Sequence, residues 1–144
     1  MKKTLILFAA AFLILACTSN EAVNAEERKV EYAEYIDDPT TISFEQSEYD
    51  FGTATDGDMV RHTFKFTNSG DKNLILIDVT GSCGCTVPES WPQHPIAPGE
   101  GGEIEVVFNS NNRVGNVRKN IRVEANTDPT LTTLTLTGKV KEKK

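Results

Sequence analysis

The sequence predicts an all-β fold, an antiparallel β-sandwich over residues 41–144. Apolar and polar residues alternate along several short runs, which is the pattern of strands with one buried face. Turn-forming residues separate the runs, as in the stretch Asn68-Ser69-Gly70-Asp71. No run has a convincing helical period, and strands do not alternate with helices, which argues against a parallel sheet. About seven short strands in this arrangement are typical of an immunoglobulin-like sandwich.

Each expected strand is identified by a short run of alternating or continuous apolar residues. The expected strands lie, in chain order, at residues 42–44, 49–52, 59–68, 74–79, 103–108, 117–125 and 134–140. In the third of these, Val60, His62, Phe64 and Phe66 share one face, so His62 is interpreted as a packed histidine in the core or at the sheet margin. The run 74–79 is apolar on both faces, as expected of a central strand.

Residues 1–16 have the pattern of a signal peptide. Lys2 and Lys3 precede an unbroken apolar run of 12 residues from Leu5 to Ala16, which is shorter than the roughly 20 residues of a membrane-spanning helix. The run ends at Cys17, and the sequence Ile14-Leu15-Ala16-Cys17 resembles the lipobox of bacterial lipoproteins. We therefore expect a lipid on Cys17 and anchoring to a membrane of the bacterial cell envelope. An ordinary signal peptide with an incidental cysteine is the alternative.

Residues 17–40 are expected to form the lipidated cysteine and an acidic linker. The stretch from Thr18 to Pro39 contains seven acidic and two basic residues. A helix over Ala25–Tyr35 has poor periodicity, so we interpret the stretch as a solvated tether with a root-mean-square reach of about 25 Å.

The charge balance argues against nucleic acid as a partner. Formal net charge is −6, and it becomes −8 when Lys2 and Lys3 leave with the signal peptide, because 13 basic residues then face 21 acidic ones. Binding to phosphates requires a concentrated basic surface, which this composition does not supply.

The most distinctive segment is Ser82-Cys83-Gly84-Cys85-Thr86. It opens a stretch of about twenty residues that we expect to be a rigid loop, since three prolines follow Trp91. Gly84 would allow a tight turn that joins Cys83 and Cys85 in a disulfide, and an oxidising envelope favours such a bond. Two thiolates with His94 could instead bind copper(I) or zinc. In the third interpretation both cysteines are simply packed beneath the loop.

Three further residues are candidates for contact with a partner. Trp91 is interpreted first as an anchor that covers one end of the sandwich, and second as an exposed recognition residue. Arg118 and Arg122 project from the polar face of one strand, where they are either solvated or face an anionic partner.

The domain resembles a bacterial domain-of-unknown-function family. Its marks are Phe51-Gly52, Phe66–Gly70, Cys83–Thr86, Pro98-Gly99 and Gly138–Val140, and the resemblance covers Thr41–Val140. The family's members are commonly short envelope lipoproteins, and the family is similar to Hydin-type and major-sperm-protein-type immunoglobulin-like domains. The resemblance implies the sandwich fold and an envelope location, but it carries no biochemical activity.

The sequence contains no established catalytic motif, such as a P-loop, Gly-x-Ser-x-Gly or His-Glu-x-x-His. We therefore expect no enzyme, but a membrane-anchored module that binds or scaffolds another envelope protein. The alternative is a lipoprotein that binds copper or zinc, or performs thiol redox chemistry, through Cys83, Cys85 and His94.

Overall fold

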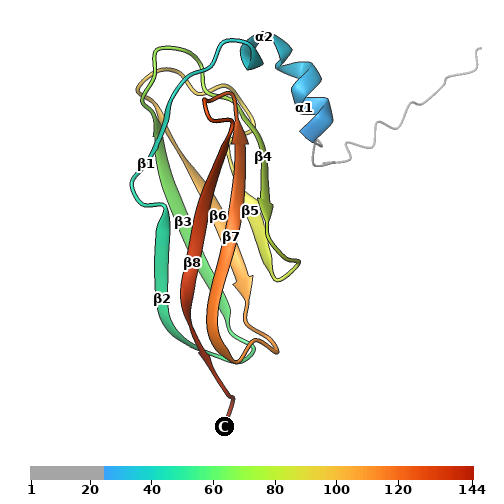
Figure 1. The fold of residues 1–144 in the computed structure, drawn as a ribbon, viewed down its shortest axis with the longest axis vertical. Coiled ribbons are helices and arrows are strands. Elements are labelled where there is room, and N and C mark those ends of the chain that lie inside the picture. Colours follow the sequence, from blue (N-terminus) through green and yellow to red (C-terminus); the bar gives the residue numbers. More distant parts are fainter. Residues whose placement is uncertain (1–24) are drawn as a thin grey trace, which may run out of the picture.

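The computed structural model describes residues 25–144 as two four-stranded sheets packed face to face (Figure 1). The predicted all-β, immunoglobulin-like sandwich is confirmed, with eight strands in the described part of the chain where about seven were expected. The strands are β1 Ile42–Phe44, β2 Glu48–Thr55, β3 Met59–Asn68, β4 Leu76–Gly81, β5 Thr86–Ser90, β6 Gly101–Asn109, β7 Gly115–Ala125 and β8 Leu131–Lys141.

The first strands of the domain change from one sheet to the other. One sheet has the order β1-β3-β6-β5 and the other has the order β2-β8-β7-β4. Residues 45–47 carry the chain from β1, which pairs antiparallel with β3, to β2, which pairs parallel with β8. The remaining pairs are antiparallel, so the predicted antiparallel arrangement is wrong only for β2 and β8.

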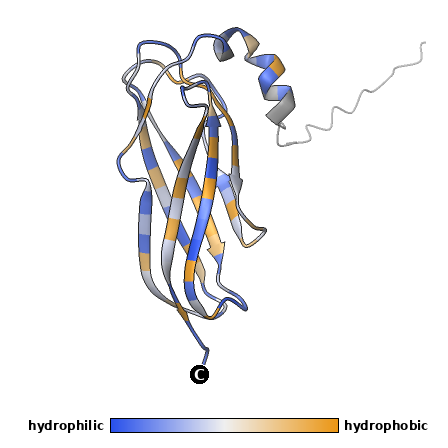
Figure 2. Cartoon of the chain, in the orientation of Figure 1, coloured by the Kyte–Doolittle hydropathy of each residue, from blue (hydrophilic) through white to orange (hydrophobic). Residues whose placement is uncertain are grey.

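The core lies between the sheets and is built from the alternating apolar positions. Figure 2 shows this alternation of apolar and polar residues along the strands. Phe64 on β3, Phe108 on β6 and Ile121 on β7 are fully buried. The run 74–79 is largely buried, as its apolar composition predicts, but the prediction of a central strand is wrong because β4 lies at the edge of its sheet.

The prediction that residues 82–100 contain no strand is wrong for Thr86–Ser90, which form β5 along β6. Pro88 is tolerated because of the direction its backbone faces. The amide of Asn109 donates to the carbonyl of Cys85 (2.8 Å), so the backbone of Cys85 faces β6. The alternation of a strand then turns the backbone of Thr86 and Pro88 toward the open edge, where a missing N–H breaks no ladder bond.

The predicted solvated tether is wrong for residues 25–39, which contain two short helices on one end of the sandwich. Helix α1 spans Ala25–Glu31 and α2 spans Ala33–Ile36. Lys29 pairs with Glu124 of β7 (2.9 Å), and the Tyr32 hydroxyl donates to the Gln93 carbonyl (3.2 Å). The C-terminus lies at the opposite end of the sandwich (Figure 1).

The signal peptide and Cys17 lie outside the described residues. Within residues 25–144, no helix combines the length and apolar character needed to cross a membrane.

Candidate functional site

The Cys-Gly-Cys segment is the crossover from β4 in one sheet to β5 in the other. Cys83 and Cys85 form a disulfide across a sequence separation of two residues, with their Cα atoms 5.2 Å apart. The sequence left three interpretations open for these cysteines: a local disulfide, a metal site and plain packing. The structure has the local disulfide.

Backbone hydrogen bonds hold this loop on both sides. The amide of Ser82 donates to the Asn120 carbonyl of β7 (2.8 Å), and the amide of Asn109 on β6 donates to the Cys85 carbonyl (2.8 Å). Within the loop, the amide of Thr86 donates to the Cys83 carbonyl (3.1 Å). Both ends of the loop are thus fixed by contacts that do not involve sulfur.

The two glycines of this region have different roles. A Cβ atom at Gly81 would overlap the carbonyl oxygen of Thr86, so the close approach of β4 and β5 requires a glycine there. Gly84 lacks a left-handed φ, and a Cβ atom built on it meets nothing within 4 Å. The turn between the two cysteines therefore does not require a glycine at position 84.

The two cysteines of the disulfide differ in burial. Cys85 is only 8% exposed and belongs to the core cluster, whereas Cys83 is half-buried and packs against that cluster. Gly84, between them, is exposed. The Cys83 sulfur lies 3.9 Å from the hydroxyl of Thr86, which is itself buried.

The disulfide stabilises the fold only slightly, because it removes little conformational entropy from the unfolded chain. Closing a three-residue loop in the unfolded chain is worth about 1.6 kcal/mol, against about 3 kcal/mol for fifteen residues. Since hydrogen bonds already hold the loop, the fold has little need of the covalent bond.

The structure does not bring His94 together with the two cysteines in a metal site. His94 is exposed, and within residues 25–144 no three His, Cys, Asp or Glu side chains gather closely enough to hold a metal ion. Sulfurs joined in a disulfide are also not thiolate ligands. A copper or zinc site at Cys83, Cys85 and His94 therefore stays a prediction for the reduced loop.

Trp91 follows β5 and is half-buried against the core cluster, which favours the anchor interpretation. Its indole Nε1 is buried and has no hydrogen-bond partner in the described structure. Arg118 and Arg122 both lie exposed on the outer face of β7. Arg118 pairs with Glu48 of β2 (2.7 Å), so one of these cations already has an acidic neighbour within the chain.

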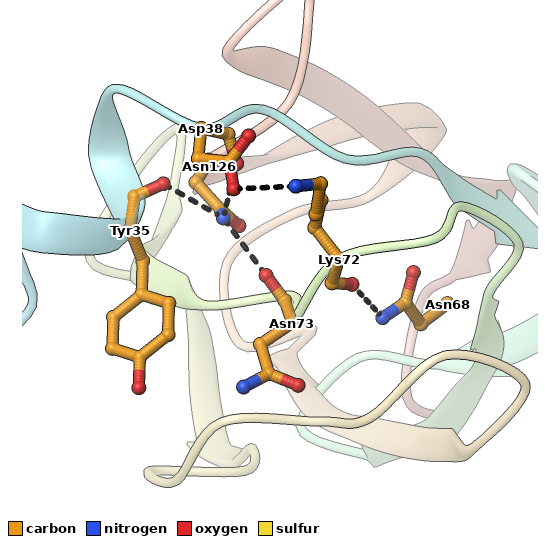
Figure 3. Close-up of polar contacts among 6 residues, drawn as sticks. All are labelled: Tyr35, Asp38, Asn68, Lys72, Asn73 and Asn126. Atoms are coloured by element: carbon orange, nitrogen blue, oxygen red, sulfur yellow. Dashed lines mark hydrogen bonds and ion pairs between the residues drawn. The ribbon is translucent and has the colours of Figure 1, made fainter.

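Sequence reasoning missed a polar cluster that joins the N-terminal segment to the sandwich (Figure 3). At its centre is Asn126, which is 1% exposed. Its side-chain amide donates to the carbonyls of Asn73 (2.9 Å) and Tyr35 (3.1 Å), and its side-chain oxygen accepts from the Ile75 amide (2.7 Å). The backbone carbonyl of Asn126 also accepts from the amide of Thr40 (2.9 Å).

A second buried asparagine supports the same end. Asn68 donates to the carbonyls of Lys72 (2.7 Å) and Ile96 (2.9 Å), and its side-chain oxygen accepts from the Thr40 hydroxyl (3.1 Å). Lys72 pairs with Asp38 (3.1 Å), and this contact raises the pKa of the exposed lysine. Both asparagines lie in stretches with turn-forming residues, and the sequence gives no sign of their burial.

The sandwich domain is similar to a known protein family. The chain matches the model of the family described as "Protein of unknown function (DUF1573)" over residues 42–140. No curated protein matches it.

Several solved structures share the fold. One is a protein of unknown function from Porphyromonas gingivalis W83, with 15% identity and a TM-score of 0.60 over 70% of this chain and 47% of that one. Another is the ASH / PapD-like domain 7 of human CEP192, with 12% identity and a TM-score of 0.58 over 74% and 89% of the two chains. A third is the secreted serine protease VesC from Vibrio cholerae, with 14% identity and a TM-score of 0.58 over 77% of this chain and 25% of the protease.

At these identities the likeness shows the fold alone. The chain also spans only about half of the P. gingivalis protein and a quarter of VesC. The family match covers more than half of the sequence and includes the Cys-Gly-Cys loop. The chain therefore belongs to the DUF1573 family, whose function is unknown and whose domain here is an immunoglobulin-like sandwich.

Proposed function

We propose that the protein is a lipid-anchored component of the bacterial cell envelope whose sandwich is a non-enzymatic module for binding or scaffolding another envelope protein. The anchoring part rests on Cys17 at the end of the apolar run. The non-enzymatic part is supported by the fold and by the surroundings of the two histidines. His62 lies within stacking distance of Tyr49 (ring centroids 3.7 Å apart), and His94 is exposed.

The observation that carries this proposal is the docking of residues 25–39 on one end of the sandwich. With those residues held by the bond of Asn126 to Tyr35 and by the ion pair of Lys72 with Asp38, only residues 18–24 separate Cys17 from α1. A flexible coil of that length has a root-mean-square reach of about 15 Å, well below the 25 Å of a full tether. The end of the sandwich that carries α2 would then face the membrane.

The opposite end, which we call the distal tip, consists of residues 56–59 and 110–115. Its two turns are joined to each other, since the amide of Asn112 donates to the Asp56 carboxylate (2.6 Å) and the amide of Ser110 donates to the Asp58 carbonyl (3.0 Å). Met59 and Val114 are both more than half exposed there. A rigid tip with exposed apolar side chains, held away from the membrane, suits contact with another protein.

Cell fractionation tests the anchoring. The wild-type protein should sediment with membranes and resist extraction by high salt, whereas Cys17→Ser should lose lipid anchoring and be released or remain as the unprocessed precursor. Cys83→Ser, as the matched control, should fractionate like the wild type. Soluble behaviour of all three proteins would contradict the proposal.

Energy transfer to an acceptor dye on lipid headgroups tests the orientation. Labels would be attached to Asp128→Cys, at the proposed membrane end, or to Arg113→Cys, at the distal tip; both positions are exposed. Transfer should be clearly stronger from position 128. Equal transfer from the two positions would contradict a fixed orientation even if the anchor is real.

A further inference from the structure

We propose that the Cys83–Cys85 disulfide is a thiol–disulfide exchange site, which accepts two electrons from a protein dithiol. This activity goes beyond the proposed binding function and does not depend on it.

The fold holds the loop without the disulfide. Hydrogen bonds attach Ser82 to Asn120 of β7 and Cys85 to Asn109 of β6. The close approach of Gly81 to the carbonyl of Thr86 fixes the distance between the two ends of the loop. Reduction would therefore leave both thiols in place and close to each other, which is the condition for a reversible cycle.

The two sulfurs of the disulfide differ in their access to a thiolate from outside. Exchange requires a thiolate to reach one sulfur of the disulfide from outside. Cys83 is half-buried and lies beside exposed Gly84. A Cβ atom built on Gly84 would meet nothing within 4 Å, so the space next to Cys83 is open. Cys85 is 8% exposed within the core cluster. Attack is thus directed to Cys83.

The exchange has two steps. A partner thiolate attacks the Cys83 sulfur, a mixed disulfide forms, and the Cys83–Cys85 bond breaks, so that Cys85 leaves as a thiolate and takes up a proton. The partner's second thiol loses its proton and attacks the partner sulfur of the mixed disulfide, which releases Cys83 as a thiolate that takes up the second proton. The partner ends as a disulfide, and Cys83 and Cys85 have gained two electrons and two protons.

Thr86 is placed to assist the second step. Its hydroxyl lies 3.9 Å from the Cys83 sulfur, within range of a weak hydrogen bond to a thiolate. Its backbone amide already bonds to the Cys83 carbonyl, so this hydroxyl stays beside the leaving sulfur.

The test uses the full chain with Cys17→Ser, in detergent, so that Cys83 and Cys85 are its only cysteines. Dithiothreitol serves as the dithiol, and thiols are counted by alkylation and mass spectrometry while circular dichroism follows the fold. We expect two thiols per chain under native conditions with an unchanged β spectrum. A disulfide that is reduced only in denaturant, or a sandwich that unfolds when it is reduced, would overturn the proposal.

Two variant pairs test the direction of attack. Cys85→Ala leaves only Cys83 in the loop, and it should react with an aromatic disulfide at least about tenfold faster than Cys83→Ala, which leaves only the buried Cys85. Gly84→Val should slow reduction of the disulfide by dithiothreitol, whereas the smaller Gly84→Ala should have little effect. Equal rates within either pair would show that the exposed side of Cys83 is not the point of attack.

Discussion

At the scale of single residues, the Cys-Gly-Cys loop depends on a glycine outside the motif. Gly81 approaches the Thr86 carbonyl so closely that no side chain fits between them, whereas Gly84 faces open space. The backbone contact between β4 and β5 thus sets the shape of the crossover, and the residue between the cysteines has little part in it.

This difference predicts opposite results for two similar substitutions. Gly81→Ala should lower the free energy of unfolding by about 1–3 kcal/mol, because backbone must move to admit the methyl group. Gly84→Ala should be neutral or stabilising by up to about 1 kcal/mol, since it restricts only the unfolded chain. Urea unfolding of the two variants measures both values, and an equal loss at the two positions would contradict this account of the loop.

His62 gives the sandwich a pH-dependent component of stability. Burial lowers the pKa of His62 from its ordinary value of 6.5. At pH values between the lowered pKa of the folded protein and the ordinary pKa of 6.5, the unfolded chain therefore binds more protons than the folded one. The stabilising contribution is fully present above about pH 6.5 and is lost as the pH falls through the folded pKa.

The corresponding prediction compares His62→Phe with the wild type. Phenylalanine can keep the contact with Tyr49 but does not titrate, so the variant should lose less unfolding free energy than the wild type between pH 7 and pH 5. Exposed His94→Phe is the control and should behave like the wild type. If His62→Phe and the wild type lose the same free energy, the histidine is not coupled to folding.

At the scale of secondary-structure elements, one buried side chain connects the two N-terminal helices to the sandwich. The Asn126 amide bonds to carbonyl groups before β1 and before β4, segments far apart in sequence. Helices as short as α1 and α2 are not stable in water on their own, so their order depends on this docking.

Asn126→Ala should therefore have a local and a global effect. Loss of the amide removes the partner of the buried Ile75 amide and of the part-buried Asn73 carbonyl, which should cost about 2–3 kcal/mol. Amide hydrogen exchange over residues 25–39 should become much faster than in the wild type. Asn116→Ala, at an exposed position of β7, should change neither quantity, and unchanged exchange in Asn126→Ala would show that other contacts hold the helices.

At the scale of the whole molecule, the alternation of apolar residues was sufficient to predict the sandwich. In β3, for example, the predicted core residues Phe64 and Phe66 are buried. Strand β5 was missed because its Pro88 and the prolines after it indicate a loop, and only the pairing with β6 shows that Pro88 faces an open edge. The sheet change between β1 and β2 also has no local signal.

The candidate site was predictable only as a set of alternatives. The spacing of Cys83 and Cys85 allows a disulfide, a metal site or plain packing, and the choice depends on neighbours brought together by the fold. The roles of Gly81 and Asn126 were missed for the same reason, since both depend on backbone groups of other segments. The docked helices in turn limit how far a lipid on Cys17 could hold the sandwich from a membrane.

In the proposed function, the mature protein begins at Cys17 and carries a lipid there. The most direct test is the mass of the N-terminal peptide of protein extracted from cell membranes. We expect a peptide that starts at Cys17 and is heavier than its sequence by a diacylglyceryl group, with or without a further acyl chain. An N-terminus at any other residue, or an unmodified Cys17, would contradict the account.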